Sequence, residues 1–118
     1  MVGITQANGT SKADTVLVLA LCSAAKKMGL NADTLASCLG ISDKEASRML
    51  NGANIFLPDR DAAIRLITVC ERVWASYGPG NEGPRAWLHA EHETLGGIPA
   101  KLLLEPESSI KVHEYLCA

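Results

Sequence analysis

The chain has 118 residues, about the size of one domain and enough to bury an ordinary hydrophobic core. Hydrophobic residues make up 47% of it and charged residues 20%, a composition that excludes a wholly disordered chain. Lys and Arg number 11 against 13 for Asp and Glu, so the net charge of −2 excludes a uniformly basic nucleic-acid binder. Residues 12–76 carry eight basic and seven acidic side chains, against three and six in 77–118, so any contact with phosphate is expected in the first part.

Residues 1–12 (MVGITQANGTSK) are polar and contain glycine, which predicts a flexible N-terminal arm. A first helix is expected to start with Asp14 as its N-cap and to run to about Met28, where Gly29 ends it. The apolar stretch 16–22 inside this helix is similar to the hydrophobic part of a signal peptide, but it is too short to cross a bilayer. We therefore expect a buried helix of a cytoplasmic protein that does not associate with membranes.

Two short helices are expected next, each with its own start and stop signals. Asn31 predicts the N-cap of a second helix that ends before Gly40. Ser42 followed by Glu45 forms the S-x-x-E capping-box pattern of a third helix, and Gly52 lies just past its end.

A fourth, longer helix follows. Pro58, with acidic residues close behind it, predicts the first turn of this helix. Apolar residues then recur at a spacing of three and four over nearly four turns, which predicts one buried face. That face is formed by Ala63, Leu66, Ile67, Cys70, Val73, Trp74 and Tyr77.

The segment 78–83 (GPGNEG) is expected to hold no regular element and to separate the chain into two halves. Beyond it, Pro84, Pro99 and Pro106 each predict the start of a short helix, and Gly96-Gly97 predicts a turn. No segment alternates polar and apolar residues as a strand would, so we predict an all-α fold.

The second and third helices, with the short link between them, fit a helix-turn-helix. Its helices pack closely, so a small residue is needed where they approach each other, and Ala36 stands there. The turn needs a residue that tolerates a positive φ, and Gly40 follows four positions later. Apolar residues at the intervals that fill the wedge between the helices are Leu35, Leu39, Ile41, Ala46 and Met49. We therefore predict a helix-turn-helix domain over residues 13–77.

The outward face of the third helix carries side chains that can bind double-stranded DNA. Arg48 is suited to the O6 and N7 edge of guanine, Asn51 to adenine, and Lys44 to phosphate. The predicted DNA-binding residues are Lys44, Ser47, Arg48 and Asn51, with phosphate contacts also expected from Lys26, Lys27 or Arg60. Because one copy carries few cations, we expect a homodimer on two half-sites.

Residues 84–118 are predicted to form a compact helical cap. Trp87 anchors it, the glycine pair allows a reversal, and the apolar side chains expected beneath Trp87 are Leu102, Leu103, Val112 and Leu116. The last residues, 115–117, place apolar groups at the end of the chain, and the stretch 16–21 is apolar almost all round. Either the fold itself or a partner is expected to cover such groups.

The order of these motifs resembles the C-terminal domain of Xre/MbcA/ParS-type antitoxins. The pattern comprises A-W-L at 86–88, L-G-G-x-P at 95–99, L-L at 102–103 and a terminal helix. It follows a Xre-like helix-turn-helix, as in that family, and the resemblance covers about residues 14–117. The resemblance implies a small helical toxin-binding domain over residues 84–118.

The resemblance also implies a function, that of the antitoxin in a bacterial type II toxin–antitoxin pair. The expected partner is a RES-domain toxin, an enzyme that depletes NAD+. Such antitoxins dimerise, occlude the toxin's NAD+ pocket and repress their own operon as part of the complex. Carried onto this chain, the toxin-facing residues are Lys111, His113, Glu114, Tyr115, Leu116 and Cys117.

The sequence predicts no enzyme, metal or cofactor site. His89 and His92 share a helix face, but no further ligand is placed beside them. His113 and Cys117 lie one turn apart without the orienting acid of a catalytic triad, and no glycine-rich phosphate motif is present. The cysteines form no C-x-x-C pair, so reduced and mostly buried thiols are expected at Cys22, Cys38, Cys70 and Cys117.

Two other functions remain open at this point. The first is a stand-alone dimeric helix-turn-helix transcriptional regulator whose C-terminal cap only dimerises it. The second is a protein-interaction module that does not bind DNA, which the negative charges of Asp43 and Glu45 near the DNA-facing side make conceivable.

Overall fold

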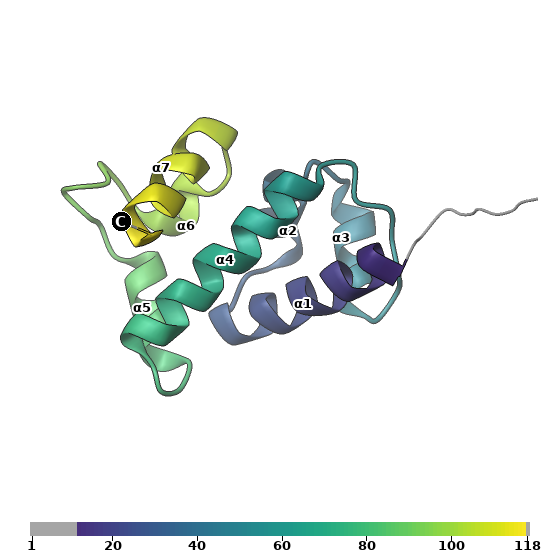
Figure 1. Ribbon diagram of the computed structural model, residues 1–118, viewed down its shortest axis with the longest axis horizontal. Coiled ribbons are helices and arrows are strands. Elements are labelled where there is room, and N and C mark those ends of the chain that lie inside the picture. The colour runs from purple at the N-terminus through teal and green to yellow at the C-terminus, as the bar shows by residue number, and fades with distance from the viewer. Residues whose placement is uncertain (1–11, 118) are drawn as a thin grey trace, which may run out of the picture.

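The computed structural model describes residues 12–117, with side chains from Thr15 onwards. Within this part of the chain the elements are helices, and the one β-type pairing is an isolated bridge between His92 and Gly97. The all-α prediction is therefore confirmed. The helices are α1 (Lys12–Met28), α2 (Ala32–Leu39), α3 (Asp43–Leu50), α4 (Arg60–Tyr77), α5 (Glu82–His89), α6 (Pro99–Leu102) and α7 (Pro106–Cys117) (Figure 1).

The start of α1 differs from the prediction. Its backbone is helical from Lys12, so Asp14 lies inside the first turn and is not the N-cap. The predicted flexible arm, 1–12, lies outside the described residues except for Lys12. The end of α1 is as predicted, at Met28, and Gly29 follows with a φ of +70°.

The helix-turn-helix forms from the predicted capping residues. The Asn31 side chain accepts a hydrogen bond from the N–H of Thr34 and so starts α2. Gly40 ends that helix in the left-handed region, with a φ of +70°. Of the residues predicted to fill the wedge, Ile41 is half-buried and the rest are buried: Leu35, Leu39, Ala46 and Met49.

Helix α4 starts later and presents a slightly different face than predicted. Asp59 is its N-cap, and the carboxylate accepts a hydrogen bond from the N–H of Ala62, so Pro58 precedes the helix. Trp74 and Tyr77 were expected on the buried face, but they are 37% and 42% exposed. Val69 is fully buried instead. The periodicity gave the helix correctly, but not which edge of its apolar stripe the neighbouring helices would leave uncovered.

Helix α5 begins inside the segment 78–83, which was predicted to hold no regular element. It starts at Glu82, two residues before Pro84. Proline fits there because the N–H groups of a helix's first turn have no acceptor within the helix. Pro99 and Pro106 are the first residues of α6 and α7, as predicted.

Helix α4 lies at the centre of the fold (Figure 1). It packs against α1 and α2 on one side and against α5 and α7 on the other. Buried residues from both predicted domains belong to one hydrophobic cluster, in which Val18 and Leu35 of the first are joined by Leu88 and Val112 of the second. None of the helices in the described part of the chain is long and apolar enough to cross a membrane.

Substituting Gly40 tests the turn of the helix-turn-helix. A Cβ at this position would meet no atom within 4 Å, so the cost of a substitution comes from the positive φ alone. We expect Gly40→Ala to lower the free energy of unfolding by about 1 kcal/mol in chemical denaturation. Gly40→Asn is the matched control and is expected to cost less, because asparagine tolerates the left-handed region. Equal stability of the wild type and Gly40→Ala would contradict this account.

Candidate functional site

The predicted DNA-binding residues lie together on the outer face of α3. Lys44, Ser47, Arg48 and Asn51 are all exposed. Their spacing of three and four residues puts them on one face of the helix. The opposite face is buried through Ala46 and Met49, each with 0% exposure, and fixes the orientation of α3.

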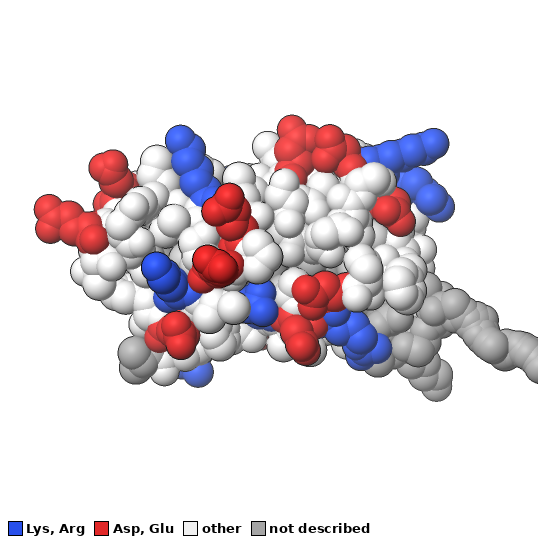
Figure 2. All heavy atoms as spheres, turned by 90° about the horizontal axis from the view of Figure 1, so that it is seen from above, with Lys and Arg blue, Asp and Glu red and all other residues white. Residues whose placement is uncertain are grey.

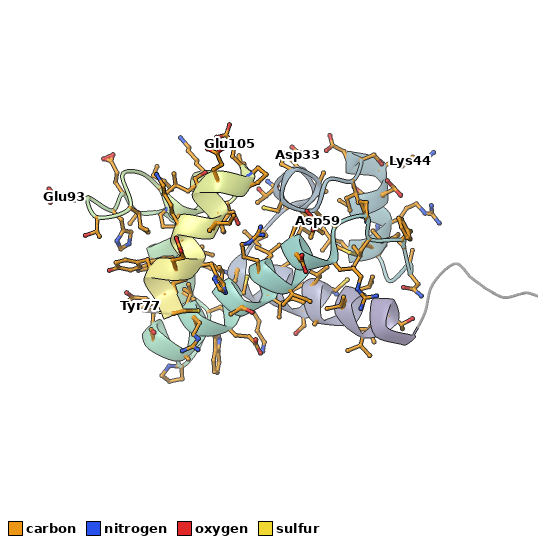
Figure 3. The ribbon with its side chains drawn as sticks, turned by 45° about the horizontal axis from the view of Figure 1, so that its top comes forward. Asp33, Lys44, Asp59, Tyr77, Glu93 and Glu105 are labelled. Atoms are coloured by element: carbon orange, nitrogen blue, oxygen red, sulfur yellow. The ribbon has the colours of Figure 1, made fainter. Side chains whose placement is uncertain are left out.

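Charges of both signs surround this face. Figure 3 shows Lys44 directed away from the body of the protein. Figure 2 shows Lys and Arg side chains projecting from the same end of the molecule, beside a group of Asp and Glu. The basic side chains therefore do not form a continuous surface on the face in view.

One of the two acidic groups near α3 is held by the backbone. The N–H of Ser42 donates to a Glu45 carboxylate oxygen at 3.2 Å, and the N–H of Glu45 donates to the Ser42 hydroxyl at 3.1 Å. This reciprocal pair is the predicted capping box. Glu45 is half-buried, so its charge is directed to the helix N-terminus, whereas Asp43 is exposed.

Asn51 keeps the groups that adenine recognition needs. Its amide nitrogen Nδ2 donates one hydrogen to the carbonyl of Ser47 at 3.0 Å. An amide nitrogen carries two hydrogens, so the second hydrogen and the Oδ1 atom remain for a two-point contact with an adenine edge.

Lys26 and Lys27, which were expected to flank the DNA face at phosphates, lie on α1 and are exposed. Lys26 and Lys27 are in the last turn of α1, whereas the start of α1 is the part linked to the α3–α4 loop, through Asn54 and Thr15. The ammonium of Lys27 lies 5.3 Å from the ring centre of Trp74 instead. Arg60 is the first residue of α4, next to the α3–α4 loop.

A second candidate surface lies at the other end of the molecule, on α7. Three of the six predicted toxin-facing residues, Lys111, Glu114 and Tyr115, are exposed and line one shallow depression of about 420 Å³. The other wall is the turn 93–96, which the sequence did not point to as part of a site. The Gly96-Gly97 pair signalled the turn, but only the packing of α7 brings it beside these three side chains.

The other three predicted residues differ in their surroundings. Leu116 packs against the core and is half-buried. His113 is half-buried, and its Nε2 atom lies 3.7 Å from the Sγ atom of the exposed Cys117. These three residues therefore lie outside the lining of the depression.

Trp87 holds the turn and the end of α4 together, as its predicted anchoring role requires. Its ring centre lies 4.7 Å from that of His92 and 5.7 Å from that of Tyr77. The side chain is 6% exposed, and its indole N–H has no hydrogen-bond partner among the described residues. The bridge between His92 and Gly97 closes the turn on its other side, with the His92 N–H donating to the Gly97 carbonyl at 2.9 Å.

Arg85 links this C-terminal part to the helix-turn-helix part. Its guanidinium donates to the carbonyl of Lys27 at 3.0 Å and to that of Lys26 at 2.7 Å. The last carbonyls of a helix receive no N–H donor from within it, so Arg85 acts as a C-terminal cap of α1 supplied from α5.

The cysteines are free thiols, as expected, but they differ in burial. Burial raises the pKa of Cys38 to about 12, and burial, helped by the charges of Cys38 and Glu71, raises the pKa of Cys70 to about 12. The Cys38 thiol donates to the carbonyl of Leu103 at 3.0 Å, across 65 residues of sequence. Cys70 is buried, Cys22 and Cys38 are half-buried and Cys117 is exposed, so the thiols are less buried than predicted.

The potential metal ligands do not converge. No group of three His, Cys, Asp or Glu side chains suited to a metal ion occurs among the described residues. The Nδ1 atom of His89 donates to the carbonyl of Arg85 at 2.9 Å, and the ring of His92 lies tilted against that of Trp87 at 54°. The sequence matches no protein-family model and no curated protein.

Thiol labelling tests the burial of the cysteines. The thiolate is the reactive form, so a raised pKa and burial both slow the reaction with a disulfide reagent. At pH 8 we expect Cys117 to react first and Cys38 and Cys70 to react only on unfolding, as followed by peptide mass spectrometry. Cys117→Ser is the control that removes the fast phase. Rapid labelling of Cys70 in the folded protein would contradict the packing of α4 against its neighbours.

Proposed function

We propose that this chain is the antitoxin of a type II toxin–antitoxin pair, which neutralises a RES-domain, NAD+-depleting toxin and represses its own operon. The proposal combines the resemblance of the sequence with two separate exposed surfaces. The observation that carries it is the outer face of α3, where four side chains are exposed: Lys44, Ser47, Arg48 and Asn51. This helix follows a turn in which Gly40 ends α2 and Ser42 caps α3.

The DNA-binding half of the proposal follows from the chemistry of that face. Arg48 supplies a guanidinium that can bond two acceptors of guanine, and Asn51 supplies the donor and acceptor that adenine requires. Lys44 and Ser47 can bond phosphate oxygens of the backbone. Because so few cations are available in one copy, the proposed repressor binds its operator as a homodimer, each copy on one half-site.

The toxin-binding half rests on α7 and the turn beside it. Tyr115 is 41% exposed on the last helix, and aromatic side chains of this kind often anchor protein interfaces. Lys111 and Glu114 lie around the same depression and would set the orientation of the partner. Under this proposal the protein acts in the cytoplasm, without a catalytic role or a cofactor of its own.

Substitution of Arg48 tests the DNA-binding half. We expect Arg48→Ala to abolish specific retention of the promoter fragment upstream of its gene in a gel shift, with unchanged helical circular dichroism. Arg72→Ala, which removes an exposed arginine of α4, is the matched control and should retain binding. If Arg48→Ala binds as the wild type does, Arg48 has no role in DNA recognition.

Substitution of Tyr115 tests the toxin-binding half. We expect Tyr115→Ala to weaken co-purification with the RES-domain toxin and to reduce rescue of growth on co-expression, by about 10- to 100-fold in affinity. Ile110→Ala is a close control, because Ile110 is also 41% exposed on α7 but five residues away, on another face of the helix.

The same assays separate the alternatives. A wild-type protein that neither co-purifies with the toxin nor restores growth would contradict the antitoxin function. If it still binds the promoter, it is a stand-alone dimeric regulator, and if it binds only a protein partner, it is an interaction module.

A further inference from the structure

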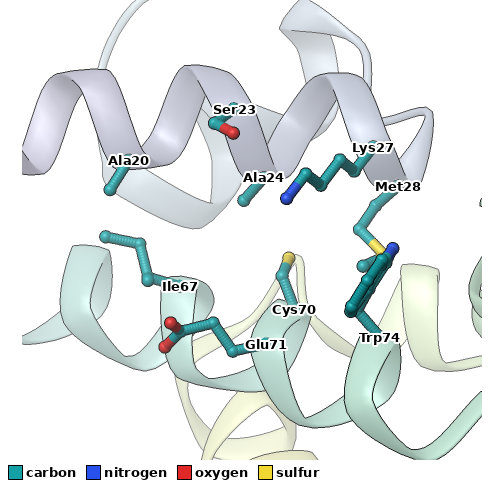
Figure 4. A pocket seen from close by; sticks show the side chains of 9 residues that line it. All are labelled: Ala20, Ser23, Ala24, Lys27, Met28, Ile67, Cys70, Glu71 and Trp74. Atoms are coloured by element: carbon teal, nitrogen blue, oxygen red, sulfur yellow. The ribbon is translucent and has the colours of Figure 1, made fainter. Parts of the chain in front are cut away.

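An apolar groove runs between α1 and α4. It has a volume of about 370 Å³, and its lining includes Ala20, Ser23 and Ala24 of α1 facing Ile67, Cys70 and Trp74 of α4 (Figure 4). The three α1 residues are small, so another helix can approach the backbone closely there. The lining is mostly apolar, with Lys27 and Glu71 as its charged members.

Large apolar side chains stand on the rim of this groove. Val16 and Leu19 are 64% and 65% exposed, the highest values among the large hydrophobic side chains described, and Ile64 is 48% exposed. Val16 lies one turn before Ala20 on the same stripe of α1, and Ile64 lies one turn before Ile67 on α4. The exposed side chains of Val16, Leu19 and Ile64 and the groove therefore belong to one continuous surface, which we call the α1–α4 face.

We propose that the α1–α4 face is covered by the same face of a second copy of this chain, in a two-fold symmetric dimer. An interface of this kind must be self-complementary, so one surface has to offer both a projection and a matching hollow. The α1–α4 face offers both, with Val16 and Leu19 near the start of α1 and the groove beside its second half.

A two-fold axis near Ala20 and Ser23 satisfies this requirement. It pairs the two α1 helices in antiparallel directions, so Val16 and Leu19 of one copy lie over the groove of the other, toward Trp74. The small residues at the centre then allow the helices to come together without steric conflict.

Size and charge both suit a second copy. A 17-residue helix is about 25 Å long and about 10 Å wide, so α1 and α4 side by side present roughly 500 Å² in projection. That projection is more than half of the ~800 Å² per partner of a standard interface. One lysine and one glutamate leave the groove without net charge, so two copies do not repel each other.

The dimer leaves the other two surfaces free. Helix α7 packs on α4 from the side opposite α1 (Figure 1), the predicted DNA-binding side chains of α3 are exposed, and Lys44 among them is directed away from the body of the protein (Figure 3). The inference rests on the proposed function only in its need for two copies. Its assay contains neither DNA nor toxin, so its failure and that of the proposed function are distinguishable.

The molar mass of the purified chain is measured by light scattering at concentrations from about 1 to about 100 µM. This range spans the dissociation constants of ordinary dimers. We expect the wild type to show twice its 12.5 kDa and Leu19→Lys to dissociate about 100-fold more readily, because it buries unpaired charge. Leu19 is exposed, so helical circular dichroism should be unchanged. Should that variant fail to fold, Ile64→Lys takes its place.

Ile110→Lys is the control, because it places the same charge on α7, outside the α1–α4 face. It should remain a dimer. If the wild type is a monomer at about 100 µM, a concentration above the dissociation constants of ordinary dimers, the proposal is wrong. The face would then bind another partner. A Leu19→Lys dimer, or equal dissociation of Ile110→Lys, would also overturn it.

Discussion

The burial of α4 from two sides is the constraint on which the rest of the structure depends. Its side chains Leu66, Val69 and Val73 are at most 3% exposed, and burying each contributes about 1.5–3 kcal/mol. Because α1 and α2 pack on one side and α5 and α7 on the other, the same helix positions both candidate surfaces. The helices that carry the α3 face and the α7 depression share one hydrophobic core, and α4 contributes to it.

Two long-range hydrogen-bonding contacts fix the orientation of helices that the apolar core holds together. Arg85 caps the end of α1 from α5, and the Cys38 thiol of α2 donates to the Leu103 carbonyl at the end of α6. Both contacts join residues about 60 positions apart, and both satisfy a carbonyl that a helix end leaves without an internal partner. They hold the C-terminal part in one orientation on the helix-turn-helix part, which apolar contact alone does not specify.

The net charge of the chain differs from the charge on the exposed face of α3. Overall it is −2, which does not favour DNA. Glu45 and Asp59, however, accept hydrogen bonds from backbone N–H groups at the starts of α3 and α4. Their negative charges lie at helix N-termini, where they stabilise the helices. The exposed face of α3 is therefore less acidic than the composition implies, although Asp43 stays exposed beside Lys44.

The sequence by itself determined the features that depend on near neighbours. Asn31, Gly40 and the Ser42–Glu45 pair act within four residues, so the helix-turn-helix and the exposed side of α3 followed from local patterns. Only the tertiary structure decided which apolar edges stay open, as at Trp74 and Tyr77, and that the Lys27 ammonium lies over the ring of Trp74. It also brought the turn 93–96 against Lys111 and Tyr115. These features depend on contacts between residues far apart in sequence, which periodicity and capping do not encode.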